Sequence, residues 1–63
     1  MKNVEEKAQE IKALLNKHTR EQLSAKIERK TGARISGSTI TRASSNKDIK
    51  PNMLHLIHYI LTH

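Results

Sequence analysis

Apolar residues recur at helical spacing along this chain of 63 residues, with charged and polar residues between them. The first such stretch predicts an amphipathic helix over about residues 2–17. Its narrow buried stripe consists of four apolar residues that lie three or four positions apart, namely Val4, Ala8, Ile11 and Leu15. No stretch shows the period of two that a β-strand requires, so the pattern predicts an all-α fold.

A capping box predicts where the second helix begins. Thr19 stands three residues before a glutamine, the spacing at which the two side chains bond to each other's backbone amides. Leu23 and Ile27 then face inward, and Gly32 suits the left-handed residue that follows a helix. These signals predict a helix over about residues 20–30.

A hydroxyl-rich segment without any acid spans residues 36–46, where six of the eleven residues are Ser or Thr. Such a run is equally typical of a flexible linker, because short hydroxyl side chains compete with a helix for backbone hydrogen bonds. A hydrophobic staple favours the helix: with Ser36 as the N-cap, Ile35 and Ile40 occupy two positions that pack together. We therefore predict a short helix over residues 37–45, ending at an asparagine that tolerates the left-handed conformation.

The last element begins at Pro51, because proline is favoured at the first helical position and keeps the preceding residue out of the helical region. Ile49 and Leu54 form a second predicted staple. The predicted helix covers residues 51–62. Its apolar residues occupy an arc of roughly 160°, wider than the roughly 100° that packing on one side needs, and the excess is available for a second contact.

Charge is distributed unevenly along the chain, whose formal net charge is +6. Residues 1–28 hold six bases and five acids, whereas residues 29–63 hold six bases and a single acid, Asp48. A positive second half favours polyanions, of which nucleic acid is the simplest and anionic membrane the competitor. The absence of cysteine excludes disulfides and thiolate-metal sites. No signal peptide and no membrane span is predicted.

Two short helices, the second with a hydroxyl-rich outer face, followed by a capped amphipathic helix describe a helix-turn-helix within a small four-helix bundle. The segments that carry the pattern are TREQLSAKI (19–27), ISGSTITR (35–42), IKP (49–51) and LHLIHYIL (54–61). Together they resemble the λ-repressor/Cro-like (XRE-type) helix-turn-helix DNA-binding family. Members of this family usually place a glycine directly after the position of Ile27, whereas here residues 28–34 intervene before the next core position. The second helix is therefore expected to run on, or the turn to be lengthened.

The resemblance implies that residues 37–45 enter the major groove of double-stranded DNA. Contacts to bases or the groove are implied for five residues: Ser38, Thr39, Thr41, Arg42 and Ser45. Contacts to phosphates are implied for six more: Arg20, Arg34, Ser36, Gly37, Lys47 and Lys50. For any single one of these basic side chains, simple solvation at the surface is the alternative.

On this resemblance, residues 1–63 are expected to form a single helix-turn-helix DNA-binding domain. The expected function is that of a sequence-specific transcriptional regulator, a phage or mobile-element repressor that acts by occupying its operator. Its expected location is the cytoplasm of a bacterial or phage-infected cell. Because two-fold operators are read by dimers, we expect a homodimer on DNA. The candidate interface is Met53, Leu56 and Ile60, for which packing against the first helix is the alternative.

The sequence leaves a second function open and disfavours the others. A small protein-interaction module, an antagonist or adaptor that binds a protein partner through residues 51–62, is favoured by the long connection and by Gly37. Membrane association is disfavoured because the last helix carries no Lys or Arg after Lys50. Nothing resembles a nucleophile elbow, a catalytic triad or a phosphate loop, so we expect no enzyme and no small-molecule substrate. His55 and His58 lack further ligands nearby in sequence, so no metal and no cofactor is expected.

Overall fold

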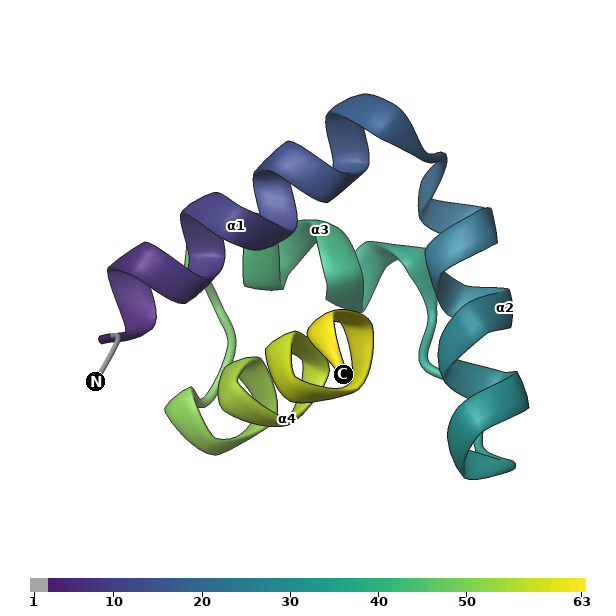
Figure 1. The fold of residues 1–63 in the computed structure, drawn as a ribbon. Coiled ribbons are helices and arrows are strands. Elements are labelled where there is room, and N and C mark those ends of the chain that lie inside the picture. The colour runs from purple at the N-terminus through teal and green to yellow at the C-terminus, as the bar shows by residue number, and fades with distance from the viewer. Residues whose placement is uncertain (1–2) are drawn as a thin grey trace.

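Four α-helices make up the fold of residues 3–63, the part of the chain that the computed structural model describes (Figure 1). They are α1 (Val4–Lys17), α2 (Arg20–Thr31), α3 (Gly37–Ser45) and α4 (Pro51–Thr62). The predicted all-α, four-helix fold is confirmed. The predicted start of the first helix at residue 2 lies outside the described residues, and the second helix ends one residue later than predicted.

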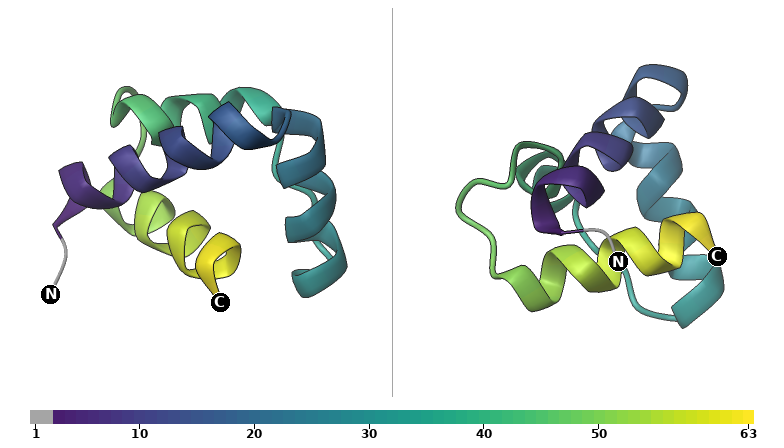
Figure 2. Two further views of the ribbon diagram at one scale, coloured as in Figure 1. Left: turned by 45° about the horizontal axis from the view of Figure 1, so that its top comes forward. Right: turned by 60° about the vertical axis from the view of Figure 1, so that its left-hand side comes forward.

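Three helices lie around a common core, and the fourth closes one end of it. α1 and α3 run side by side in nearly opposite directions, and α4 lies beneath them (Figures 1 and 2). α2 stands across the end of this group, where it packs against both α3 and α4. The first turns of α2 and α3 are thereby brought close to each other.

The helix starts follow the local signals in the sequence. Both bonds of the predicted capping box form, since the Thr19 amide donates to Gln22 Oε1 at 2.9 Å and the Gln22 amide donates to Thr19 Oγ1 at 3.1 Å. Ser36 is the N-cap of α3, and its Oγ accepts from the Thr39 amide at 3.3 Å. Pro51 occupies the first turn of α4, where its missing N–H costs nothing.

The connection between α2 and α3 is lengthened in two ways. α2 runs on to Thr31 and ends at Gly32, whose φ of 77° is the left-handed conformation predicted for it. Residues 32–36 then form the turn itself. Thr31 Oγ1 donates to the Ile27 carbonyl at 2.8 Å and also accepts from the Ala33 amide at 3.1 Å. The connection is therefore one added turn of helix followed by a hydrogen-bonded loop.

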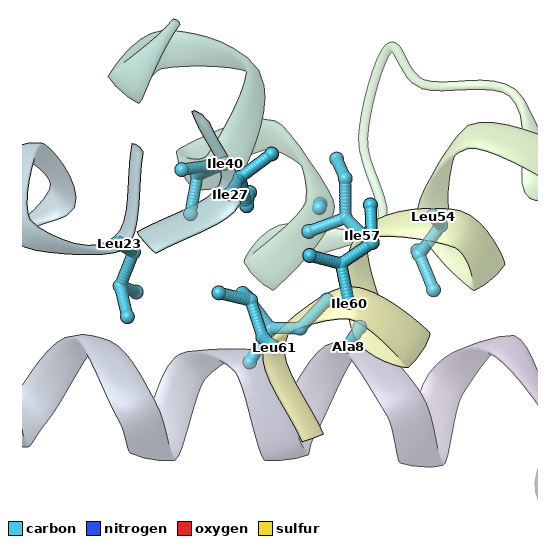
Figure 3. Packing of buried hydrophobic residues seen from close by; sticks show 10 residues of the cluster. Ala8, Leu23, Ile27, Ile40, Leu54, Ile57, Ile60 and Leu61 are labelled. Carbon is cyan, nitrogen blue, oxygen red and sulfur yellow. The ribbon is translucent and has the colours of Figure 1, made fainter. Parts of the chain in front are cut away.

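One hydrophobic core joins all four helices (Figure 3). Ile35 and Ile49, the residues that precede the N-caps of α3 and α4, are half-buried against it, as the two predicted staples require. The buried apolar residues are Ala8, Ile11, Leu23, Ile27, Ile40, Ala43, Leu54, Ile57, Ile60 and Leu61.

Two lysines of α2 hold the carboxyl end of α4. Lys30 Nζ donates to the Ile60 carbonyl at 2.9 Å, and Lys26 Nζ donates to the Leu61 carbonyl at 3.3 Å. The last turn of α4 has no basic residue of its own, so the lysines supply the positive charge that complements this end of the helix dipole.

Replacement of Lys30 by methionine tests this contact. The Lys30→Met variant keeps the length and helix propensity of the side chain but loses the donor, so we expect a loss of about 1 kcal/mol in the free energy of unfolding. Urea titration followed by circular dichroism measures it. Arg29→Met, at the exposed neighbouring position, is the matched control and should lose much less. An equal loss in both variants would contradict a specific contact by Lys30.

Candidate nucleic-acid interface

α3 turns one face to the core and the opposite face to solvent. Ile40 and Ala43 are fully buried, which fixes the rotation of the helix about its axis. At 100° per residue, the residues opposite this pair are those that the sequence assigns to the DNA groove. Four of the five predicted groove residues share the exposed face: Ser38, Thr41, Arg42 and Ser45.

The fifth predicted groove residue, Thr39, lies on the flank of α3 and not on its outward face. Its side chain is half-buried, and its Oγ1 lies 2.9 Å from Ser36 Oγ. Its amide donates to the same oxygen. Thr39 therefore serves the N-terminal cap of the helix in this structure, a role that the sequence pattern did not separate from groove contact.

The exposed hydroxyls of α3 bond back to the helix. Thr41 Oγ1 donates to the Gly37 carbonyl at 3.0 Å, and Ser45 Oγ donates to the Thr41 carbonyl at 3.3 Å. A hydroxyl whose proton is used in this way still offers its lone pairs outward. Arg42, in contrast, carries only donors. The face therefore combines hydrogen-bond acceptors with a strong charged donor, as the edges of bases in a major groove require.

A backbone hydrogen bond holds Lys47 directly after the last turn of α3. Asn46 adopts the left-handed conformation with φ of 52°, as the sequence predicts, and the amides of Asn46 and Lys47 donate to the carbonyls of Ala43 and Arg42 at 3.2 and 3.1 Å. Lys47 is exposed directly after the helix, and Lys50 is exposed at the start of α4. Both predicted phosphate contacts thus follow α3 in the chain, Lys47 directly after the helix and Lys50 at the start of α4.

The other four predicted phosphate residues come together at the opposite end of α3. A polar hollow of about 290 Å³ lies between the first turns of α2 and α3. Its lining combines Arg20, Arg34, Ser36 and Gly37 with three residues that sequence reasoning did not join to them, namely Glu21, Ser24 and Ser38.

The side chain of Arg20 lies against Gly37. A Cβ at residue 37 would lie 2.9 Å from Arg20 Cγ, closer than real Cβ atoms come, and 3.0 Å from its Cδ, so a larger residue there would require the exposed arginine side chain to shift. The arginine stem therefore lies over the first residue of α3. Arg34 is also at this hollow, and its Nη1 is 4.0 Å from Glu28 Oε1 in a loose, exposed ion pair.

One of the three residues predicted to form an interface on α4 is buried. Met53 and Leu56 are 40% and 49% exposed, but Ile60 is only 8% exposed and belongs to the core. Ile60 is therefore not part of an exposed face of α4. Tyr59 takes its place on that face, since it is 61% exposed and stacks on the His63 ring at a centroid distance of 4.4 Å.

Two histidines of α4 lie in different surroundings. His58 Nε2 lies 2.8 Å from Glu10 Oε1 and links α4 to α1, while His55 Nδ1 is buried without a hydrogen-bond partner. Within residues 3–63, no three His, Asp or Glu side chains are grouped as metal ligands would be. None of the four helices described here has the length and apolar character that crossing a membrane requires.

Comparison of the chain with protein-family models, with curated proteins and with solved structures gave no match.

The loop that carries Lys47 depends on the left-handed conformation of Asn46. Alanine there should cost about 1 kcal/mol, because its Cβ disfavours this conformation, whereas Asn46→Gly should be neutral or stabilising. Thermal unfolding of both variants measures the difference. If alanine and glycine gave equal stability, the conformation of residue 46 would not limit the end of α3.

Proposed function

We propose that this chain is a sequence-specific duplex-DNA-binding regulator of the λ-repressor/Cro-like helix-turn-helix type. The observation that carries the proposal is the outward face of α3, which offers Ser38, Thr41, Arg42 and Ser45 to solvent and no acid. An α-helix with short polar side chains fits a major groove about 12 Å wide, where hydroxyls and arginine read base edges.

Positive charge at both ends of α3 supports the same proposal. Arg20 and Arg34 stand at its amino-terminal end, and Lys47 and Lys50 follow its carboxyl-terminal end. Phosphates of the two strands border a major groove on either side, so a helix in the groove needs donors at both of its ends. Lys26 and Lys30 take no part, since they hold the end of α4.

The proposed activity is repression by occupancy of an operator, without chemistry, in a phage or mobile-element setting. One small module makes few contacts, and two-fold operators are read by dimers, so the DNA-bound form is proposed to be a homodimer. The exposed apolar face of α4, formed by Met53, Leu56 and Tyr59, is the candidate dimer contact.

Binding to duplex DNA, measured by fluorescence anisotropy at several salt concentrations, tests the proposal. Affinity should fall steeply with salt because phosphate contacts release counterions. Lys47→Ala should weaken binding to all duplexes alike and reduce the slope of log K against log salt by about 1. Arg42→Ala should cost about 1–3 kcal/mol on the selected site and remove preference at one base position.

Arg29→Ala is the control, because it removes the same charge from an exposed position at the far end of α2 and should leave discrimination among duplexes unchanged. Selection from random duplexes supplies the preferred site. If no duplex is retained at low salt, the regulator proposal is lost.

The second candidate function is that of a protein-interaction module that binds a partner through α4. The exposure of Met53, Leu56 and Tyr59 on one helix favours it. The two functions separate in one experiment, since a module of this kind would not prefer any duplex and its partner binding would survive Arg42→Ala.

A charge on the α4 face tests the dimer. Leu56→Glu should leave the helical content intact, because Leu56 is half exposed, and should convert a dimer to a monomer in analytical ultracentrifugation. Asn16→Glu makes the same charge change at an exposed position of α1 and should leave the dimer unchanged. Wild-type protein that binds its selected site as a single protomer would contradict the dimer.

A further inference from the structure

The connection between α3 and α4 holds an acid that no contact in the fold explains. Asp48 is exposed, and its carboxylate makes no hydrogen bond and no ion pair with any residue from 3 to 63. Its backbone φ is 54°, a left-handed conformation that aspartate tolerates and that glycine adopts without steric cost. The backbone therefore favours a residue that tolerates this conformation, but no bond among the described residues requires a negative charge.

This charge lies between two lysines that also lack partners. Lys47 precedes Asp48 and Lys50 follows it, and both are exposed without an ion pair to any described residue. Consecutive Cα atoms are about 3.8 Å apart, so the Cα of Asp48 lies at most about 7.6 Å from that of either lysine. This separation is comparable with the screening length of about 8 Å at physiological salt. An anion bound by either lysine is therefore repelled by the carboxylate.

We propose that Asp48 limits the affinity of this surface for the DNA backbone, so that duplexes without the selected site are released. The inference rests on the proposed function, in which Lys47 and Lys50 are phosphate contacts. Non-specific binding is almost entirely electrostatic, whereas a selected site is also held by base contacts. An acid beside two phosphate donors lowers the affinity for every duplex, and only a site with base contacts compensates for the loss. Asp48 is the single acid of residues 29–63, so no other acid of that half of the chain has this effect.

Replacement of Asp48 by asparagine removes the charge and keeps both the size of the side chain and its tolerance of the left-handed conformation. By fluorescence anisotropy, the affinity for the selected duplex and for random duplexes should rise by a similar factor, about two- to fivefold at low salt. The gain should shrink as the salt concentration is raised. No change, or a weaker affinity for the selected duplex, would overturn the proposal, and the weaker affinity would indicate that Asp48 contacts a base.

The matched control is Asn16→Lys, which makes the same charge change at an exposed position in the last turn of α1. This end of α1 is the one farther from the connection between α3 and α4 (Figures 1 and 2). The control should gain less affinity than Asp48→Asn. Thermal unfolding of both variants is measured alongside. A loss of stability in Asp48→Asn with unchanged affinity would overturn the proposal and assign the carboxylate to the positive end of the α4 dipole, whose first turn has no acid.

Heparin, a polyanion without bases, separates a failure of this inference from a failure of the proposed function. Asp48→Asn should elute from immobilised heparin at a higher salt concentration than both the wild type and Asn16→Lys. That result in a protein that retains no duplex would uphold the effect of Asp48 on the two lysines and refute the proposed function. Elution at the wild-type salt concentration, in a protein that binds its selected duplex, would refute the inference and leave the proposed function standing.

Discussion

The packing of α3 against the core is the constraint on which the rest of the surface depends. At nine residues, α3 is shorter than the roughly 12–15 residues that an isolated helix needs to be marginally stable in water. Its composition of Gly, Ser and Thr is also poor in helix formers. Two side chains, Ile40 and Ala43, anchor it in the core, while Ser36 and Asn46 fix its ends. The outward residues of α3 therefore take no part in core packing.

A core of this size gives only a small free energy of unfolding. Polar contacts between helices that are far apart in the sequence add to this stability. Lys26 and Lys30 join α2 to the end of α4, and His58 joins α4 to Glu10 on α1. All of these contacts include α4, and one side of this helix is exposed to solvent. They hold α4 under α1 and α3 without using the residues at either end of α3.

The sequence predicted those features that depend on neighbouring residues, such as the capping box at Thr19 and the left-handed residues Gly32 and Asn46. It did not predict which edge of the wide apolar arc on α4 would be covered, because that depends on where α1 and α2 lie. Ile60, which the sequence assigned to the candidate interface, is therefore buried, whereas Tyr59 is exposed. The hollow around Ser24 was also missed, since its lining comes from residues 20–38 and no periodic pattern joins them.

The long connection after Ile27 also has a physical reason. The turn of helix added there, which ends at Thr31, carries Lys30, and Lys30 reaches the last turn of α4. A chain that turned directly after Ile27 would have no α2 backbone from which to make this contact. The extension is therefore better explained by its contact with α4 than by recognition. The start of α3 is fixed independently of it, by the Ser36 cap and by Arg20 across Gly37. The lengthened turn and a defined placement of α3 are thus compatible, because different residues determine each of them.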